Sequence, residues 1–330
     1  MKKIALFFGG PSNEHEVSIM SAKNVVKYFD YKKYRLILIY WSRKNHRFYL
    51  IKNINKLSIS QSNRLKIEDF SKLFDIALPM THGRYGEDGV LQAILESQKI
   101  KYCGCRVLSS AVCMDKAVFK NLLTAQNIPQ VKYHIIDFQN DRQISLASIE
   151  KIIKRNFSFP VYIKPANSGS SVGITRVEKM CQLATAVREA QRHDPKILIE
   201  QGLTNPREIE MAVLGNKQLL ISRPGELRLV KDFYNYDDKY KLGQAQLVIP
   251  TKLTSIQSKQ IIKIVEQVYR LTNCQGFARI DFFISKNNKI YLNEINTLPG
   301  FTDISMYPKL MMNQGMTYQQ LINRIIKLAY

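Results

Sequence analysis

The chain has 330 residues, of which 45% are hydrophobic and 23% are charged, and its formal net charge is +22. This is the composition of a globular protein, and it excludes a disordered or fibrous chain. No apolar run reaches the roughly 18–20 residues of a membrane span, and the apolar stretch after Lys3 stops at Gly9, short of the roughly 7–15 residues of a secretion signal. We therefore expect a soluble, cytoplasmic protein with no membrane partner.

The positive charge comes from 49 Lys and Arg against 27 Asp and Glu. An excess of this size would suit a nucleic-acid binder. The lysines are scattered along the chain with no run longer than a pair, however, so we expect no nucleic-acid partner. A basic surface also attracts anionic small molecules such as nucleotides.

The five cysteines form neither a disulfide ladder nor a C-x-x-C metal pair. Cys103 and Cys105 are the only close pair, and no further cysteine or histidine cluster accompanies them. We expect buried free thiols in a reducing compartment.

The first third of the chain predicts a β-α-β unit. Residues 3–8 form a buried strand, Gly9 and Gly10 a tight turn, and a helix follows from about Glu16. Further strands are expected at residues 34–40 and 75–80. Ligands of such a unit gather at the carboxyl ends of its strands. The glycine pair alone is equally compatible with a simple strand-to-helix turn.

The remaining two thirds predict two more lobes. We expect a strand at 160–164, a loop of small residues to 173 and a strand at 197–200. Strands at 208–215 and 219–222 follow, then a polar, aromatic segment at 224–246, a helix at 254–271, a hairpin at 278–296 and a closing helix around Leu321. The predicted fold is α/β with three lobes, at residues 1–105, 106–202 and 203–330.

The hairpin is the most informative segment. A two-residue turn at Asn287 and Asn288 would set Asp281 opposite Glu294, with Asn296 on the same face. Facing carboxylates repel each other unless a cation lies between them, and Asp, Glu and Asn oxygens suit Mg²⁺. The alternative is a solvated polar sheet face, since the opposite face is apolar and accounts for the core.

Three loops carry further polar patterns. Residues 164–173 (KPANSGSSVG) resemble a phosphate cradle without Walker spacing, or else form a flexible surface loop. Lys164 lies in an otherwise apolar strand and needs an anion to offset its burial. Residues 82–89 (HGRYGEDG) precede an apolar helix, as a capped loop also would. Residues 233–240 alternate tyrosines with charges, as a mobile lid would, the alternative being core tyrosines.

Taken together, these segments resemble the D-alanine–D-alanine ligase family of ATP-grasp enzymes over essentially the whole chain. The opening turn at residues 9–18 (GGPSNEHEVS) is similar to the family's first motif, and residues 82–89 to its H-G-x-x-G-E-D-G signature. Met114-Asp115-Lys116 and the loop at 164–173 follow in the expected order. Arg279 to Asp281 with residues 293–300 (NEINTLPG) resemble the second signature.

The resemblance implies a three-lobed ATP-grasp fold with a Rossmann-like N-terminal domain, and a reaction in two steps. The carboxylate of one D-alanine attacks the γ-phosphate of ATP, which gives an acyl phosphate and ADP. The amine of a second D-alanine then attacks the acyl carbon, and phosphate leaves. The product, D-alanyl-D-alanine, is a precursor of peptidoglycan. The family also implies a homodimer.

The resemblance assigns roles to individual residues. Two Mg²⁺ ions, or Mn²⁺, would be held by Asp281, Glu294 and Asn296. ATP would be bound by Lys116, Lys164, Ser170, Ser171, Glu200, Gln201, Leu203, Glu208 and Lys239. The first D-alanine would meet Glu14 and His82, with Glu14, Ser170 and Tyr240 in one hydrogen-bonded triad. Arg279 and the N–H of Gly300 would form the oxyanion hole, and Ser305 and Met306 would line the second subsite.

Two other functions compete with this one. A D-alanine–D-lactate or D-alanine–D-serine ligase belongs to the same family, but the Lys239-Tyr240 pair favours the D-alanine enzyme because lactate-using relatives lack that tyrosine. Met306 stands where leucine is frequent and bears on the choice of second substrate. A basic, non-catalytic nucleotide- or nucleic-acid-binding protein is disfavoured by the intact set of Arg279, Asp281, Glu294 and Asn296.

Overall fold

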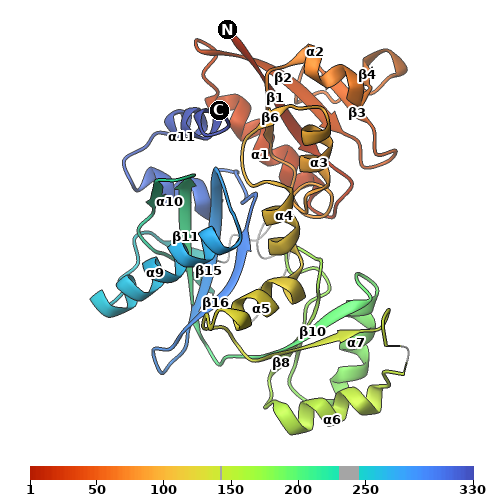
Figure 1. The fold of residues 1–330 in the computed structure, drawn as a ribbon, viewed down its shortest axis with the longest axis vertical. Helices are drawn as coiled ribbons and strands as arrows, with labels where there is room; N and C mark the ends of the chain where they lie inside the picture. Colours follow the sequence, from red (N-terminus) through yellow and green to blue (C-terminus); the bar gives the residue numbers. More distant parts are fainter. Residues whose placement is uncertain (142, 230–244) are drawn as a thin grey trace.

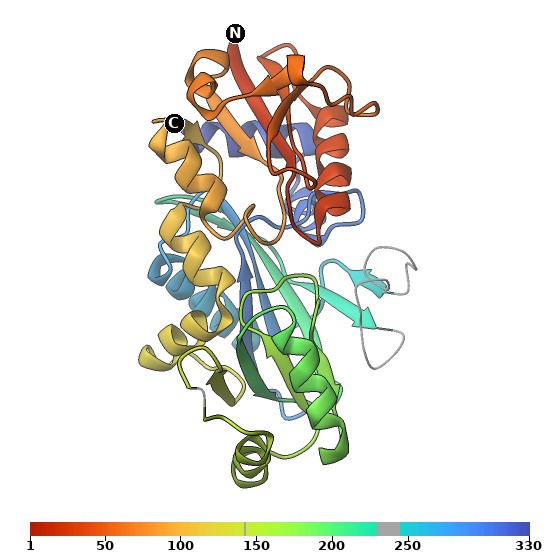
Figure 2. The ribbon, with the colours of Figure 1, turned by 90° about the vertical axis from the view of Figure 1, so that its right-hand side faces the viewer.

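The computed structural model describes residues 1–141, 143–229 and 245–330 and contains three β-sheets (Figure 1). They are stacked along the long axis of the molecule, with the first sheet at one end and the second at the other (Figures 1 and 2). This mixed α/β arrangement confirms the predicted fold class. Within the described ranges, no helix is both long and apolar enough to cross a membrane.

The first sheet has the strand order β4-β3-β2-β1-β5-β6. Its strands are β1 (Lys2–Gly9), β2 (Tyr34–Trp41), β3 (Phe48–Ile51), β4 (Arg64–Leu65), β5 (Ile76–Pro79) and β6 (Lys101–Tyr102), and its helices are α1 (His15–Tyr28), α2 (Phe70–Leu73) and α3 (Val90–Ser97). β1 pairs in parallel with both β2 and β5. The predicted β-α-β unit is therefore present, and the turn after β1 lies at the carboxyl edge of the sheet.

The second sheet is antiparallel, in the order β7-β10-β8-β9. Its elements are β7 (Tyr133–Asp137), β8 (Val161–Pro165), β9 (Thr175–Val177), β10 (Lys196–Gln201), α6 (Leu146–Asn156) and α7 (Leu183–Gln191). Two helices lead into it from the first sheet, α4 (Val107–Met114) and α5 (Lys116–Ala125). Asp115 begins α5 by accepting the N–H groups of Ala117 and Val118.

The third sheet follows the order β14-β13-β11-β15-β16, with β12 paired to β11. Its elements are β11 (Arg207–Gly215), β12 (Leu219–Ile221), β13 (Gly225–Leu229), β14 (Ala245–Val248), β15 (Phe277–Ile284), β16 (Ile290–Asn296) and α9 (Ser255–Leu271). The segment predicted as a polar, aromatic stretch at 224–246 therefore begins with one strand, and a second strand starts at its end. The predicted lid between these two strands, with Lys239 and Tyr240, lies outside the described residues.

In the hairpin of β15 and β16 the predicted residue pairing is present, but the turn differs from the predicted one. The two-residue turn is wrong: Ser285 pairs with Lys289, and residues 286–288 form a three-residue loop in which Asn288 has a φ of 59°. That loop alone would set Asn293 opposite Asp281. A bulge leaves Asn293 without a partner strand residue, so that Asp281 pairs with Glu294 after all. Asp281 and Glu294 therefore lie opposite each other, as predicted.

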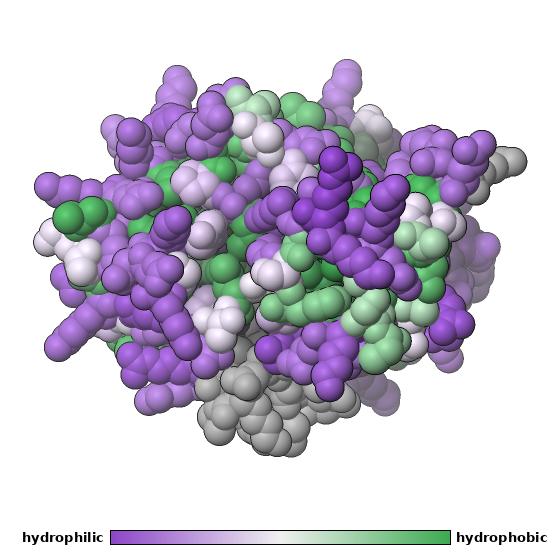
Figure 3. All heavy atoms as spheres, turned by 90° about the horizontal axis from the view of Figure 1, so that it is seen from below, coloured by the Kyte–Doolittle hydropathy of each residue, from purple (hydrophilic) through white to green (hydrophobic). Residues whose placement is uncertain are grey.

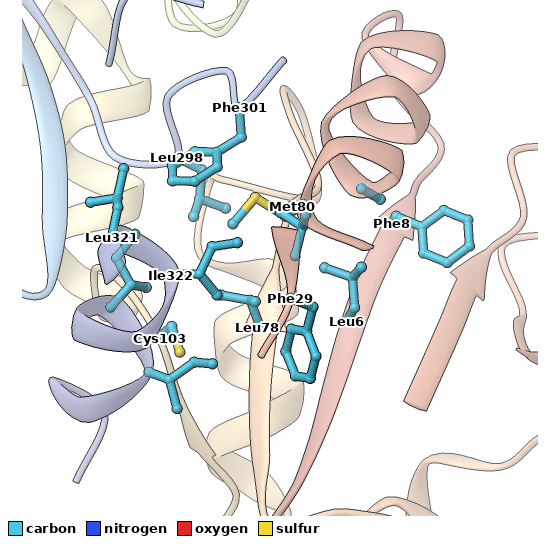
Figure 4. Close-up of a cluster of buried hydrophobic side chains, with 14 of the residues drawn as sticks. Leu6, Phe8, Phe29, Leu78, Met80, Cys103, Leu298, Phe301, Leu321 and Ile322 are labelled. Atoms are coloured by element: carbon cyan, nitrogen blue, oxygen red, sulfur yellow. The ribbon is translucent and has the colours of Figure 1, made fainter. Parts of the chain in front are cut away.

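The largest hydrophobic cluster joins the two ends of the chain. The last two helices belong to this cluster: α10 (Met306–Met312) lies against β11 of the third sheet, and α11 (Tyr318–Lys327) packs against the first sheet. Leu321 and Ile322 of α11 lie among Leu6 and Leu78 of that sheet (Figure 4). The boundaries near residues 105 and 202 remain our prediction.

The outer face shown in Figure 3 is mostly hydrophilic, with smaller apolar areas between the polar side chains. The five cysteines are free, as expected. Four of them are buried, but Cys181 is exposed, contrary to the expectation that all would be buried.

Candidate active site

A cleft of about 730 Å³ opens where the three sheets meet. Its lining includes every predicted site residue in the described part of the chain. They are Glu14, His82, Lys116, Lys164, Ser170, Ser171, Glu200, Gln201, Leu203, Glu208, Arg279, Asp281, Glu294, Asn296, Gly300, Ser305 and Met306. Segments that are nearly 300 residues apart in the sequence therefore contribute to one cavity.

Glu14 forms a corner of the cleft between two glycine-containing loops. The hydroxyl of Ser170 donates a short hydrogen bond to Glu14 Oε1. A Cβ at either Gly83 or Gly169 would lie 2.5 Å from Glu14 Oε2, so neither position accepts a side chain without moving the carboxylate. The predicted Glu14–Ser170 contact is thus present, and its third member, Tyr240, lies outside the described residues.

His82 is buried next to this part of the cleft, and its hydrogen bonds select one tautomer. Its Nδ1 lies 3.0 Å from the carbonyl oxygen of Leu298 and its Nε2 lies 2.9 Å from Ser21 Oγ. Because a carbonyl only accepts, Nδ1 carries the proton and Nε2 accepts from Ser21. Burial lowers the pKa of His82 to about 4, against the weaker opposing effect of the Leu298 carbonyl. His82 is therefore neutral near pH 7, and both of its ring nitrogens are engaged by protein groups.

Glu87 is a half-buried acid that the sequence analysis did not single out, although it belongs to the 82–89 signature. Burial raises the pKa of Glu87 well above its ordinary value, and the negative charge of Glu14 raises it further. The N–H of Gly83 donates to Glu87 Oε1 at 3.1 Å. The cleft wall beside Glu14 thus holds a second carboxyl group that favours its neutral form.

The predicted phosphate loop is tied to helix α5 and to the first sheet. Lys116 Nζ donates to the carbonyl oxygen of Ser168 at 2.5 Å, and Ser170 reaches Glu14 as described. Ser170 and Ser171 adopt φ values of 49° and 60°, a conformation that L-residues rarely adopt. The loop is therefore held in an unusual shape by contacts at both ends, which supports the cradle over a loose surface loop.

The anion that pairs with Lys164 is a carboxylate of the protein itself, that of Glu200. Its Nζ lies 2.5 Å from Glu200 Oε2, and Lys120 Nζ lies 3.1 Å from Glu200 Oε1. Burial alone would raise the pKa of Glu200, but the two lysines outweigh it and hold the pKa at about 2. Glu200 is thus a carboxylate with two cations, one of which, Lys120, sequence reasoning missed. A lysine one helical turn after Lys116 was the available signal.

The segment after Glu200 lies close to the backbone of residues 158–160. The Gln201 side chain bonds back to Ser158, donating from Nε2 to the carbonyl oxygen at 2.8 Å. A Cβ at Gly202 would lie 2.6 Å from the carbonyl oxygen of Pro160, so only glycine fits there. Leu203 and Glu208 line the cleft beyond this point.

The polar face of the hairpin concentrates charge. Arg279 donates to both oxygens of Asp281, at 2.8 and 2.7 Å, and its Nε lies 2.8 Å from Glu210 Oε2. Asn296 Nδ2 also donates to Asp281 Oδ2, at 2.9 Å. Burial alone would lower the pKa of Arg279, but Asp281 and Glu210 outweigh it and raise the pKa well above the usual value.

The donor set on this face fits a hard divalent cation. Asp281 and Glu294 are directly opposite each other, and Asn296 adds an amide to the same face. Among the described residues, no group of three or more His, Cys, Asp or Glu side chains is arranged to hold a metal ion. The predicted set has two carboxylates and one amide, so it would need oxygen ligands from elsewhere, such as phosphate or water.

The predicted second subsite lies at the start of α10. Ser305 Oγ accepts the N–H of Thr302 at 3.0 Å, and a Cβ at Gly300 would lie 2.9 Å from the same oxygen. Met306 is buried below, where it would meet a Cβ at Gly225. Ser305 is therefore held close to Thr302 and Gly300 within this short loop, and Met306 packs against Gly225.

Two family models match this chain. Residues 3–105 match "D-ala D-ala ligase N-terminus" and residues 122–327 match "D-ala D-ala ligase C-terminus". A D-alanine–D-alanine ligase of Caldicellulosiruptor bescii is 41% identical, over 99% of this chain and 94% of its own. One of Clostridium acetobutylicum is 40% identical, over 99% and 98%.

Solved structures agree with these sequence matches. The D-alanine–D-alanine ligase of Coxiella burnetii superposes with a TM-score of 0.83 at 33% identity, covering 99% of this chain and 93% of its own. The VanG D-Ala:D-Ser ligase of Enterococcus faecalis gives a TM-score of 0.87 at 32% identity, covering 100% and 99%. The predicted family resemblance and the ATP-grasp fold are thereby confirmed.

Proposed function

Because this chain belongs to the D-alanine–D-alanine ligase family, we propose that it joins two D-alanine molecules through a D-alanyl phosphate, with its cleft residues in the roles given below. The family's reaction is ATP-dependent formation of a carbon–nitrogen bond for peptidoglycan synthesis. The observation that carries the residue assignments is the single cleft lined by all the predicted site residues in the described ranges.

Glu14 receives the ammonium group of the first D-alanine. Its carboxylate is fixed by Ser170 and by the close approach of Gly83 and Gly169, so it offers a preformed anionic partner for a small cation. His82 is neutral and does not repel that ammonium group. Tyr240 is proposed as the third member of this group on the strength of the sequence motif.

Lysines and loop groups neutralise the phosphates of ATP. Lys116, Lys164, Ser170 and Ser171 lie on or beside the phosphate loop, and Lys239 is proposed to join them. Phosphoryl transfer depends mostly on positioning and on compensation of charge. The adenine ring is bound by the segment that contains Glu200, Gln201 and Leu203, and the ribose hydroxyls are bound by Glu208.

Asp281, Glu294 and Asn296 would hold two Mg²⁺ ions, with Mn²⁺ as a substitute. These ions would supply positive charge to the phosphate oxygens. Arg279 is held by Asp281 and Glu210 and, together with the N–H of Gly300, stabilises the oxyanion that forms when the second amine attacks. Ser305 binds the carboxylate of the second D-alanine, and Met306 limits its side chain.

The assay is release of phosphate from ATP with and without D-alanine, followed by identification of the product. D-alanyl-D-alanine and D-alanine-dependent phosphate release are expected. D-serine and D-lactate, offered at equal concentration, should give little mixed product between pH 6 and 9. Mainly mixed products at neutral pH would contradict the substrate assignment, and binding of ATP without any D-alanine-dependent release of phosphate would contradict the enzyme assignment. We also propose a cytoplasmic homodimer.

A further inference from the structure

Lys120 is a buried cation with no role in the assignments above. It lies on α5, one helical turn after Lys116, and is 1% exposed. Its Nζ lies 3.1 Å from Glu200 Oε1 but makes no well-aligned hydrogen bond with any described residue. A buried ammonium group is costly unless its charge is used. Lys120 therefore acts on Glu200 mainly through its charge.

Lys120 does not line the main cleft. Within the described ranges, the lining of that cleft includes Lys164 and Glu200 but not Lys120. Lys120 instead borders a separate space of about 10 Å³, together with Lys164, Glu200 and Glu294. This space is near the minimum that one water molecule needs. The ion pair of Lys120 thus lies beside the proposed nucleotide site and not in its lining.

The proposed function makes a demand on Lys164 that Glu200 would oppose. Lys164 must offer its charge to phosphate oxygens, yet its Nζ lies 2.5 Å from a carboxylate that is 2% exposed. A buried carboxylate with a single cation would bind that cation strongly, because releasing it leaves an uncompensated buried charge. With two cations, one of them can leave while the other keeps the charge balanced.

We infer that Lys120 is a positioning residue that keeps Glu200 electrically balanced, and so makes the charge of Lys164 available to the phosphates of the nucleotide. This inference rests on the proposed nucleotide site. In this arrangement the Glu200 carboxylate holds both lysines in place. Lys120 balances the negative charge of Glu200 at all times, whereas Lys164 shares its positive charge with the phosphates of the ligand.

The test measures binding of ADP and of adenosine to the Lys120→Met variant by calorimetry. Methionine keeps the length of the side chain and removes its charge. We expect the ADP affinity to fall by about tenfold, the scale of one weakened charge contact. The adenosine affinity should change little, because adenosine carries no phosphate for Lys164. Lys154→Met, on the exposed face of α6, is the matched control.

A second pair of variants tests the coupling to Glu200. In a Glu200→Gln background, Lys120→Met should cost no further ADP affinity, since no carboxylate remains to capture Lys164. This comparison carries the test alone if the single Lys120→Met variant fails to fold. A further loss of ADP affinity in the double variant would overturn the inference.

Two other results have separate meanings. Equal losses of adenosine and ADP affinity in Lys120→Met would show that Lys120 only packs the site, and unchanged ADP affinity would show that its charge is not needed. Either result overturns the inference and leaves the proposed function intact. Failure of the unaltered protein to bind ADP would instead overturn the proposed function.

Discussion

The buried and half-buried charges of the cleft are each compensated by charges of opposite sign. Arg279 is paired with Asp281 and Glu210, and Glu200 with two lysines. Buried charges of this kind are weak contributors to stability but costly to disrupt one partner at a time. Such groups hold charge at a fixed position near the reacting atoms, and transfer of a phosphoryl group requires this kind of charge stabilisation.

Asp281→Asn tests the metal assignment. The substitution keeps the shape of the side chain and removes one negative charge from the face that Glu294 and Asn296 share. We expect turnover to fall by about a hundredfold or more, the scale for loss of a group that stabilises developing charge. The measurement is D-alanine-dependent release of phosphate at several Mg²⁺ concentrations.

The fold should survive this change because Arg279 keeps Glu210 at 2.8 Å. Circular dichroism and a urea titration check that. Glu150→Gln, in a surface pair on α6, is the matched loss of one carboxylate and should leave turnover unchanged. Near-normal turnover of Asp281→Asn would show that Asp281 is not a metal ligand.

His82 should make stability sensitive to acid. Its pKa is about 4 in the folded protein, against about 6.5 for an unperturbed histidine. The neutral ring therefore contributes stability that is fully present above pH 6.5 and is lost as the pH falls from 6.5 towards 4. Between pH 7 and pH 5 the loss should be roughly 2 kcal/mol, from 1.36 kcal/mol per pKa unit.

The measurement is the free energy of unfolding in urea, at pH 7 and pH 5, for the unaltered protein and for His82→Gln. The difference between the two proteins should shrink at pH 5, because the variant has no ring to protonate. All other titrating groups are common to both and cancel. A difference that stays constant or grows at pH 5 would mean that His82 is not held neutral.

At the level of elements, the hairpin shows how a correct pairing can follow from a wrong turn. Alternation of apolar and polar residues in β15 fixes which face Asp281 occupies, and this could be predicted because its period is two residues. The loop of residues 286–288 and the bulge at Asn293 could not, because Asn287 and Asn288 suit more than one turn type. The two deviations cancel at Asp281.

Outside the hairpin, too, an element with a clear local sequence pattern could be predicted, and an element without one could not. α9 was predictable because Thr254 and Gln257 form a capping box before an amphipathic run. β13 and β14 were missed, because their few residues flank a segment whose polar and aromatic composition resembles a loop. The Glu14–Ser170 contact was expected only from the family motif, since no local pattern links residues 156 positions apart.

Two single-residue deletions should separate the roles of the loop and the bulge. Deleting Asn287 shortens the loop at the far end of the hairpin and leaves the bulge unchanged, so we expect turnover close to normal. Deleting Asn293 keeps each strand pair but removes the bulge, which bends and twists the strand next to Glu294. We expect that variant to fold and to lose most of its turnover.

The assay for both deletions is phosphate release at saturating ATP, with unfolding by urea as the control for stability. Equal turnover in the two variants would mean that the bulge does not orient Glu294. A large loss on deleting Asn287 would instead show that the loop itself contributes to the site.

On the scale of the whole molecule, the chain closes on itself. Lys2 Nζ lies 3.8 Å from the ring centre of Tyr330, and Asn323 of α11 donates to Asp30 Oδ2 at 2.9 Å, after α1. The last helix, α11, thus packs against the first sheet and covers part of its apolar surface. The apolar face of α11 was readable from its period, but which sheet it covers was not, because periodicity marks a buried face without naming its partner.

Leu321→Ala should therefore destabilise the sheet at the opposite end of the sequence. Leu321 is fully buried in the cluster with Leu6 and Leu78 (Figure 4). Truncating a leucine in such a core typically costs about 2–5 kcal/mol, through lost burial and a residual cavity. Gln319→Ala, at an exposed position of the same helix, should change the free energy of unfolding by less than about 0.5 kcal/mol.

Hydrogen exchange of the backbone shows where that loss falls. If α11 completes the first sheet, amides of β1 and β5 should exchange faster in Leu321→Ala than in Gln319→Ala, while those of β8 and β10 in the second sheet should change least. Activity per folded molecule should fall as well, because Glu14 and His82 follow β1 and β5 directly. Faster exchange confined to α10 and α11 would mean that the terminal helices are an independent unit, and that the first sheet does not depend on them.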